Sequence, residues 1–547
     1  MPYGDDKHRR IYEALVSILS EDNVEDDPAV VEAFYRDYYS YMSMLPPRVE
    51  FWVLPGSVGD VQAIYRLANR LDFPTSVSST GLLLATCSAL PGYPYWCFID
   101  PKRMNQFWVD PENMYAVTEP YVSIAQLQSE TMKYGLFAGV TGAGSQGSAL
   151  ATHLGANTQW TGWRTGRGRS LLGFEWVLPT GEIVRTGSLA TGKEEYFWGE
   201  GPGFDYHGLW RAGALGPMGA FGTVTKAAVK LFPWPGPKVI PTEGVQPEKK
   251  SVLPQDVFKA FVYDFPSLEA CVEAIRELAI AEVGAVASQS NVMDLLMLTT
   301  RSREEFWQKW HQPYWQQVIH NSGHMVMLIL WAYAGRGQME YEEEVISQIA
   351  REFNGKPINK TELEWLHDSL TASAVRDSHR GRYMRLGPLS GTGGGCDSLY
   401  DGVRSIKEGW RIKKQLTPPM GDGGLYDMGN ENHKMWLADF GRIATSAVGA
   451  FGDKAADFEV WFAKTVIPYV VKYNNENRIF STNDPFDASL TGHKYGNIQN
   501  YIASIKRELD PKNIASPGRL VNMRNIEKQQ AQVSNAVSTG MTAGSGH

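Results

Sequence analysis

One stretch of the chain predicts a β-hairpin: Leu172-Gly-Phe-Glu-Trp-Val-Leu-Pro-Thr-Gly-Glu-Ile-Val-Arg-Thr-Gly187. Two runs, Leu171–Leu178 and Glu182–Thr186, flank the turn residues Pro179-Thr-Gly181. Proline and glycine between two runs that contain β-branched and aromatic residues are typical of a tight turn. We therefore expect two antiparallel strands here.

A small βαβ unit is expected upstream of the hairpin. Phe51-Trp-Val-Leu-Pro55 has the pattern of a short strand closed by proline, and Phe73–Val77 that of the next strand. Between them a helix is predicted from Ser57 to about Leu71, with Ser57 as its N-cap. Strand, helix and strand in this order are typical of a βαβ unit.

A domain boundary is predicted downstream of the hairpin. The predicted strand Phe221–Phe232 ends at Pro233-Trp-Pro-Gly-Pro237, and a polar stretch continues to Pro254. Beyond it the pattern predicts strands over 257–265, 285–296 and 324–334 and helices over 267–281 and 340–353. Alternating strands and helices of this kind predict an α+β domain whose antiparallel sheet is covered by helices on one face.

The composition is that of a globular protein with more than one domain. The chain has 547 residues, 43% of them hydrophobic and 20% charged, and a single core stops growing at about 250–300 residues. The net charge is −8 without a basic stripe, so nucleic acid is not expected as a partner.

No apolar run reaches the length of a membrane span, and the N-terminus lacks the apolar core of a secretory signal, so a cytoplasmic location is expected. Four scattered cysteines form no metal-binding or cluster-binding pattern.

Three blocks together resemble the FAD-linked oxidases of the vanillyl-alcohol oxidase/p-cresol methylhydroxylase superfamily, including glycolate oxidase subunits. The blocks are the hairpin 172–187, then Gly219-Ala-Phe-Gly-Thr-Val-Thr-Lys-Ala-Ala-Val-Lys-Leu231, then Ile505-Lys-Arg-Glu-Leu-Asp-Pro-Lys-Asn-Ile-Ala-Ser-Pro-Gly-Arg519. The resemblance implies a two-part FAD-binding domain of the p-cresol methylhydroxylase type, interrupted by a cap domain that holds the substrate. The implied segments are 1–236 for the first part, 237–454 for the cap, 455–524 for the closing part and 525–547 for a mobile tail.

The resemblance implies that two loops hold the FAD diphosphate through backbone N–H groups, which only small residues bring close to a ligand. A third segment, at the start of the second block, is expected to lie near the flavin or its adenine arm. The implied cofactor-binding residues are Ser78, Ser79, Thr80, Gly81, Gly142, Gly144, Ser145, Gly147, Ser148, Thr152, Gly222 and Val224. Taken alone, the Gly/Ser loop 142–148 is more often a tight turn than a nucleotide-binding loop, and its place between the other two blocks favours the cofactor.

The first loop departs from the family, because Leu82-Leu83-Leu84 stands where relatives are richer in glycine and often carry Arg and Asn. This departure leaves open a second hypothesis, a partner subunit that kept the fold and lost the flavin. We expect FAD to be bound without a covalent link. Cys87 and His153 are the nearest candidates for a tether, and a buried, hydrogen-bonded His153 is the expected alternative.

Candidate catalytic residues fall in two places. His493 and Tyr495 precede the closing block, on a stretch that returns across the flavin face in relatives. Arg382 and Tyr383 belong to a polar run of the cap, where Arg suits a carboxylate and Tyr a proton transfer; a solvated basic surface explains the same run. A cluster of Asp422, Asp427, Glu431 and His433 lacks the His-Gly pattern of metal-using relatives, so no metal is expected.

The expected function is an FAD-dependent dehydrogenase or oxidase. It oxidises a C–OH or activated C–H carbon by hydride transfer to flavin N5, since in flavoenzymes the cofactor carries the redox chemistry. The Arg run favours a hydroxy acid and the aromatic content favours a phenolic or other aromatic alcohol. The electron acceptor is left open between oxygen, a quinone and a protein partner or sister subunit, and an oligomer is expected.

Overall fold

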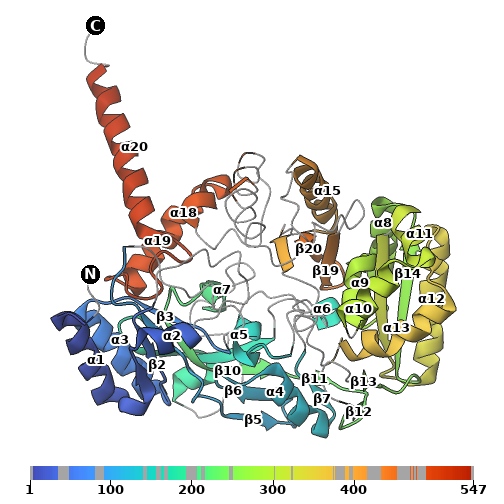
Figure 1. Ribbon diagram of the computed structural model, residues 1–547, viewed down its shortest axis with the longest axis horizontal. Coiled ribbons are helices and arrows are strands. Elements are labelled where there is room, and N and C mark those ends of the chain that lie inside the picture. Colours follow the sequence, from blue (N-terminus) through green and yellow to red (C-terminus); the bar gives the residue numbers. More distant parts are fainter. Residues whose placement is uncertain are drawn as a thin grey trace.

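Figure 1 shows the computed structural model of the chain. The structure describes residues 4–34, 49–80, 92–139, 145–154, 162–165, 170–192, 206–210, 216–244, 250–300, 302–321, 324–373, 375, 389–393, 398–415, 433–451, 468–469, 472, 476 and 488–543.

The N-terminal part folds around a small sheet in the order β1-β2-β4-β3. Its strands are Val24–Glu25, Phe51–Val53, Cys97–Ile99 and Thr75–Val77, and the last three run parallel. Two helices, α1 (Asp6–Leu19) and α3 (Val58–Leu71), bury their apolar faces against it. Ser57 caps α3 by accepting a hydrogen bond from the Asp60 N–H, so the predicted βαβ unit and its N-cap are confirmed.

A second, antiparallel sheet has the order β5-β6-β10-β8-β9. Its strands are Phe107–Asp110, Tyr115–Thr118, Thr223–Lys230, Leu171–Val177 and Ile183–Arg185. The predicted hairpin is confirmed as β8 and β9, with Trp176 opposite Val184. Strand β10, from the second block, pairs with β8 on its other side. The first two blocks therefore form the centre of one sheet.

The cap is a seven-stranded antiparallel sheet in the order β17-β14-β16-β15-β19-β20-β18. Its strands are Lys356–Pro357, Phe258–Phe265, His324–Trp331, Val286–Ser290, His433–Ala438, Ile443–Phe451 and Leu389–Gly393. The helices of this region are α8 (Leu268–Ile280), α9 (Val292–Thr299), α10 (Arg303–Trp310), α11 (Pro313–Asn321), α12 (Arg336–Glu352), α13 (Lys360–Ser373) and α15 (Leu399–Gln415). The α+β fold class is confirmed.

Helices cover both faces of the cap sheet, so the expectation of a single covered face is wrong. Strand β16 decides this, because all eight of its residues are buried. Met325, Met327 and Ile329 face α9, α10, α11 and α13, whereas Val326 and Leu328 face α8, α12 and α15. An uninterrupted apolar run is typical of a strand that is buried on both faces.

One predicted strand of this region is shorter than expected. The predicted strand 285–296 ends at Ser290, and Val292–Thr299 forms helix α9 instead. A short apolar run does not separate strand from helix by its periodicity, which explains the error. The helix expected over residues 455–473 lies almost entirely outside the described residues.

The core crosses the predicted boundary at residue 236. Trp234, Phe137, Phe258 and Trp331 form one aromatic cluster with ring centroids 5.0–5.7 Å apart. A second link is α6 (Gly162–Thr165), whose Trp163 is fully buried in the cap and donates to the Val283 carbonyl over 2.9 Å. The two regions are therefore joined by packed side chains on both sides of the boundary.

A helix, α20 (Met523–Ala543), occupies most of the segment for which the sequence predicts a mobile tail. Its first turn is anchored by Met523 and Ile526, which are buried beside α18 (Ala488–Thr491) and α19 (Ile498–Leu509). The rest of α20 projects away from the body of the protein (Figure 1).

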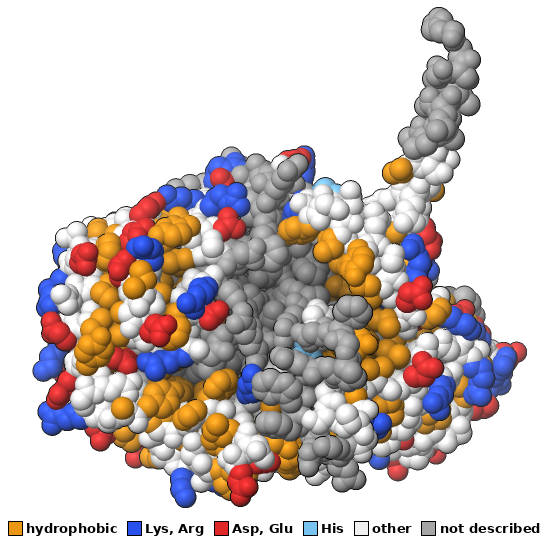
Figure 2. All heavy atoms as spheres, turned by 180° about the vertical axis from the view of Figure 1, so that it is seen from behind, with side chains coloured by type: hydrophobic (Ala, Val, Ile, Leu, Met, Phe, Trp, Pro, Cys, Tyr) orange, Lys and Arg blue, Asp and Glu red, His pale blue; other side chains and the backbone are white. Residues whose placement is uncertain are grey.

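The surface shows mixed charge. On the face drawn in Figure 2, acidic and basic side chains are interspersed with apolar ones. Among the described residues, no helix combines the length and the apolar character needed to cross a membrane.

Candidate flavin site

The first candidate loop leaves the small sheet at the carboxyl end of β3. Ser78, Ser79 and Thr80 follow directly after Val77, and all three are half-buried. Ligands of open parallel sheets bind outside the carboxyl ends of the strands. The position and the hydroxyl groups of this loop therefore suit a phosphate-bearing ligand.

The C-terminal block closes this edge of the sheet. The Thr75 N–H donates to the Ile514 carbonyl and the Ser516 N–H donates to the Thr75 carbonyl, both over 2.7 Å. Residues 514–516 thus run beside β3 as an added parallel segment, although 439 positions separate Thr75 from Ile514 in the chain. The C-terminal block thereby reaches the loop that begins at Ser78.

The second block meets the other two at Gly219. A Cβ atom at this position would lie 2.8 Å from Ser516 Oγ and 2.9 Å from Val77 Cγ1. Gly219 also has a φ of 77°, which glycine adopts without strain. Three segments that are far apart in sequence therefore converge here, at a spacing that only glycine permits.

Three side chains hold residues 220–223 in place, two of them through backbone carbonyls and one through the Thr223 hydroxyl. Lys506 Nζ donates to the Ala220 carbonyl over 2.6 Å, and Trp176 Nε1 donates to the Phe221 carbonyl over 2.7 Å. The Tyr65 hydroxyl lies 2.9 Å from Thr223 Oγ1. Because α19, β8 and α3 each supply one contact, the loop is fixed before any ligand binds.

Lys506 and Asp510 form a buried ion pair at the centre of this arrangement. Their side chains are 0% and 1% exposed, and Lys506 Nζ lies 2.6 Å from Asp510 Oδ2. Lys506 also donates to the Ala515 carbonyl, and Asp510 accepts from the N–H groups of Ile514 and Ala515. Burial lowers the pKa of Lys506 and the Asp510 carboxylate opposes this. The pair therefore fixes the Asp-Pro turn whose end presents Ser516.

The second candidate loop is described from Ser145 onward. The carbonyls of Ser145 and Gly147 accept the Ala125 and Ile124 N–H groups, so this loop caps α4 (Ile124–Thr131). Ser148 Oγ donates to the Pro120 carbonyl over 2.6 Å and accepts from the Ala151 N–H. The Ser148 hydroxyl is thus already hydrogen-bonded within the protein. We therefore expect Ser148 to contact the phosphate only through its backbone N–H group.

His153 lies inside helix α5 (Ala149–Leu154), one residue after the buried Thr152. Its ring nitrogens are 2.6 Å from the Ala149 carbonyl and 3.0 Å from the Ala138 carbonyl, and the side chain is 0% exposed. Burial lowers the pKa of His153, and the two carbonyls oppose this. The expected buried, hydrogen-bonded histidine is confirmed.

Gly222 and Val224 are required by the protein itself. A Cβ at Gly222 would lie 2.2 Å from the Val177 carbonyl oxygen, and its φ is 103°. Val224 is buried and pairs with Trp176 within the sheet. Close approach to β8 is therefore a reason for glycine at position 222 that does not depend on the flavin, and the contact of Gly222 and Val224 with the flavin stays a prediction.

The other predicted site residues are not gathered at this point. His493 is exposed and Tyr495 half-buried, both in a 3₁₀ turn (Gly492–Tyr495) that packs against its neighbours α18 and α19. Gly81, Gly142, Gly144, Arg382 and Tyr383 lie outside the described residues, and so do three members of the acidic cluster, Asp422, Asp427 and Glu431. Among the described residues, no group of three or more His, Cys, Asp and Glu side chains is placed to hold a metal.

Two buried polar residues of the site were missed by the sequence reasoning, Ser516 and Arg519. Ser516 is 0% exposed and its Oγ has no hydrogen-bond partner among the described residues. Arg519 is 5% exposed and lies in the same turn, since its N–H donates to the Ser516 carbonyl. The Asp510-Pro511 and Pro517-Gly518 pairs of the third block were the signal that could have found them.

The residues that converge here fit the diphosphate of a flavin dinucleotide. A buried hydroxyl without a protein partner costs free energy unless a ligand satisfies it. Ser516 supplies such a hydroxyl, and Ser78, Ser79 and Thr80 supply half-buried ones beside it. Small neutral donors around a glycine backbone are the usual means of holding phosphate at close range.

Comparison with known proteins supports this assignment. Residues 49–187 match the family described as FAD binding domain. The flavoprotein subunit of 4-cresol dehydrogenase (hydroxylating) from Pseudomonas putida is 28% identical over 187 residues, 33% of this chain and 34% of that protein. Glycolate oxidase subunit GlcD from Bacillus subtilis is 25% identical over 233 residues, 42% of this chain and 46% of that protein. The matched regions thus span less than half of either relative.

Solved structures resemble the whole chain. p-Cresol methylhydroxylase with substrate bound superposes with a TM-score of 0.72 at 15% identity, covering 96% of this chain and 99% of that one. 4-Ethylphenol oxidase from Gulosibacter chungangensis gives the same TM-score at 18% identity, covering 95% and 98%. Residues 49–187 therefore match an FAD-binding domain, the whole chain shares the fold of p-cresol methylhydroxylase and 4-ethylphenol oxidase, and its cofactor is FAD.

Proposed function

We propose that the protein is an FAD-dependent oxidoreductase that oxidises a C–OH or activated C–H carbon. One observation carries the proposal: Val77, Gly219 and Ser516 converge and leave a buried serine hydroxyl without a protein partner. FAD, when bound, supplies the acceptor for a hydride at N5. The task of the chain is then to hold the dinucleotide, position the substrate and accept the substrate proton.

We propose an aromatic alcohol or alkylphenol as the substrate, with a hydroxy acid as the alternative. The names 4-cresol dehydrogenase (p-cresol methylhydroxylase) and 4-ethylphenol oxidase support a phenol. The name of a third relative, glycolate oxidase, supports a hydroxy acid. A phenolate and a carboxylate both need a cationic or hydrogen-bonding anchor, for which Arg382 and Tyr383 of the cap are the proposed residues.

The test is anaerobic mixing of the FAD-loaded protein with each substrate class. We expect 4-alkylphenols and 4-hydroxybenzyl alcohols to bleach the flavin absorbance and lactate or glycolate to leave it unchanged. Bleaching by the hydroxy acids alone would reverse the substrate assignment. If neither class, nor any other alcohol in a broad screen, reduces the flavin, the proposed reaction is wrong.

Residue roles can be tested once a substrate is known. A group that accepts the hydroxyl proton contributes roughly 10²–10⁴-fold to the rate, so we expect Tyr383→Phe to slow flavin reduction by about that factor. Tyr495→Phe tests the other proposed tyrosine. His493→Ala is expected to have little effect, because the side chain is exposed. A reversed order, with His493→Ala slow and Tyr383→Phe unchanged, would move the proton acceptor to the turn before α19.

Electrons then leave through an acceptor that we propose to be a protein partner. Two curated relatives are named as subunits, which supports a partner for this chain. Size-exclusion chromatography of an affinity-purified native complex is expected to show a second polypeptide. Rapid reoxidation of the isolated, reduced chain by oxygen would instead identify a self-sufficient oxidase.

A further inference from the structure

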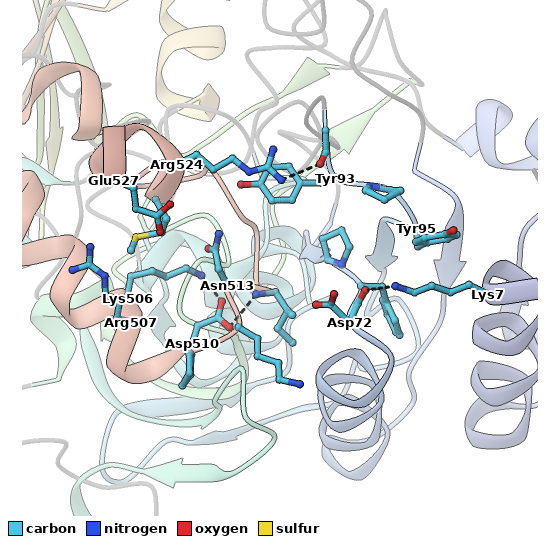
Figure 3. Close-up of a pocket in the computed structure, with 18 residues that line it drawn as sticks. Lys7, Asp72, Tyr93, Tyr95, Lys506, Arg507, Asp510, Asn513, Arg524 and Glu527 are labelled. Atoms are coloured by element: carbon cyan, nitrogen blue, oxygen red, sulfur yellow. Dashed lines mark hydrogen bonds and ion pairs between the residues drawn. The ribbon is translucent and has the colours of Figure 1, made fainter. Parts of the chain in front are cut away.

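A cavity of about 690 Å³ opens at the edge of the small sheet where strands β3 and β4 begin (Figure 3). It is lined by residues 72–74, which precede β3, and by residues 92–95, which precede β4. The flavin loop leaves the other end of β3, at Ser78. The cavity is therefore distinct from the flavin site, and it has the size of ordinary small-molecule pockets.

The cavity has an aromatic floor. Phe73 and Tyr95 are buried, and Tyr93 is half-buried. The Arg524 guanidinium lies 3.8 Å from the centre of the Tyr93 ring, and Lys7 Nζ lies 4.8 Å from the centre of the Tyr95 ring. These contacts hold two cationic side chains in fixed positions over the floor.

Three basic side chains that line the cavity have N–H groups left over to bind a ligand. Lys7 donates to the Asp72 carbonyl over 2.8 Å, Lys512 to the Asn69 carbonyl over 2.7 Å, and Arg524 to the Gly92 carbonyl over 3.0 Å. Within the described part of the chain, none of the three forms an ion pair with a carboxylate. An ammonium has three N–H donors and a guanidinium five, so each can bind a further acceptor.

The wall carries an excess of positive charge on a chain whose net charge is −8. The acidic side chains there are Asp72, Asp510 and Glu527, and Asp510 is neutralised by Lys506. Four further basic side chains line the same wall, from positions 7, 507, 512 and 524. An anion is therefore favoured over a cation.

Two buried polar atoms on the same wall have no hydrogen-bond partner among the described residues. They are the Tyr93 hydroxyl and Asn513 Oδ1. Burial raises the pKa of Tyr93, and the neighbouring Arg524 guanidinium and Asn513 side chain oppose this, so the hydroxyl stays protonated and can donate as well as accept. Asn513 Oδ1 accepts only, and it needs a donor such as a ligand hydroxyl.

We propose that this cavity is a binding site for a small hydroxylated organic anion, held by Arg524 and Lys512 at its charged group and by Tyr93 and Asn513 at its hydroxyl groups. A carboxylate and a phosphate ester share this chemistry. Residues 510–514 form one wall of the cavity, and the same segment continues to Ser516 at the flavin site. A bound anion is therefore expected to stabilise the segment that closes the flavin site.

Binding is tested by isothermal titration calorimetry of the FAD-loaded protein with glycerol 3-phosphate, citrate and, as a neutral control, glycerol. We expect saturable binding of at least one anion and none of glycerol. Arg524→Gln should weaken that binding about tenfold or more, and Tyr93→Phe about threefold to tenfold. Arg351→Gln, an exposed arginine of α12 in the cap, is the matched control and should bind like the parent. Flavin content should be the same in all four proteins.

Each outcome decides the proposal. Binding of glycerol 3-phosphate alone identifies a phosphate ester as the ligand, and binding of citrate alone identifies a carboxylate. No saturable binding of either anion, or equal binding by parent and Arg524→Gln, overturns it. Hydrogen exchange at residues 512–516 adds a second measurement, in which protection by the bound anion is expected.

Discussion

At the scale of single residues, Ser516 and Ser148 show the difference between a side chain available to a ligand and one that stabilises the fold. The Ser516 hydroxyl is buried but makes no hydrogen bond to the described protein. Ser148, in contrast, uses its hydroxyl to bind the Pro120 carbonyl. Two buried serines of the same site thus have different roles: the sequence reasoning assigned Ser148 to the cofactor and missed Ser516.

Replacing Ser516 by alanine is therefore expected to weaken FAD binding with little loss of stability. A hydrogen bond to a charged group contributes roughly 1.5–3 kcal/mol, which corresponds to a rise in the dissociation constant of about 10- to 100-fold. Fluorescence titration of the apoprotein with FAD measures it. Ser504→Ala, on the exposed face of α19, is the control. An unchanged dissociation constant for Ser516→Ala would place the phosphates elsewhere.

His153 predicts a pH dependence of stability. Burial lowers its pKa in the folded protein below the ordinary value of 6.5. As pH falls below that value the unfolded chain takes up a proton that the folded chain does not, so stability is lost as the pH decreases. The slope reaches at most about 1.4 kcal/mol per pH unit for one proton.

Thermal unfolding of the apoprotein between pH 7.5 and 5 measures this slope. His153→Gln is expected to be less stable at every pH but to lose less stability on acidification than the parent. The exposed His311 provides the control, and His311→Gln should keep the parent slope. If His153→Gln and the parent have parallel profiles, the ring takes up its proton at the same pH in the folded and the unfolded chain, which would contradict a lowered pKa.

At the scale of elements, α19 connects the C-terminal block to the flavin site through one buried lysine. Lys506 binds Ala220, Ala515 and Asp510 together. Removing one partner of a buried ion pair costs about 3–5 kcal/mol. We therefore expect Lys506→Met to lower the unfolding free energy by about that amount, measured by urea denaturation. The exposed Lys528→Met serves as control, and an equally small effect for both would refute the role of the pair.

The elements also show what the sequence could and could not predict. Patterns that depend on neighbours in the chain were reliable, as in the β8–β9 hairpin and the Ser57 cap. Strand β16 was placed correctly, but its uninterrupted apolar run was not used to infer two covered faces. The segment after Ser290 turned into helix α9, because a short apolar run does not distinguish the two structures by periodicity.

For the site, the sequence predicted the three blocks but not the residues at which they meet. Val77, Gly219 and Ser516 are joined only by the tertiary fold, and no local pattern marks a serine hydroxyl as unpaired. Gly222 was assigned to the flavin, and the structure adds a reason for glycine that the sequence did not reveal: a Cβ there would lie 2.2 Å from the Val177 carbonyl oxygen. Such assignments depend on distances between segments that are remote in sequence.

At the scale of the whole molecule, segments near both ends of the chain form the candidate cofactor site. The N-terminal sheet, the central antiparallel sheet and the C-terminal block each supply one side, while the aromatic cluster around Trp234 and the inserted α6 hold the cap against them. Figure 1 shows the N-terminal and C-terminal parts side by side and the cap beyond them. We expect a cap fixed in this way to shield the proposed reaction at the flavin from water.

The central claim is that the converging segments hold FAD, and the absorbance spectrum of the purified protein tests it most directly. The account predicts the visible bands of oxidised flavin, in an amount equal to the protein, with the flavin released into the supernatant on acid precipitation. Flavin that stays with the precipitate would show a covalent link and correct only that detail. A folded but colourless protein that cannot be reconstituted with FAD would contradict the account.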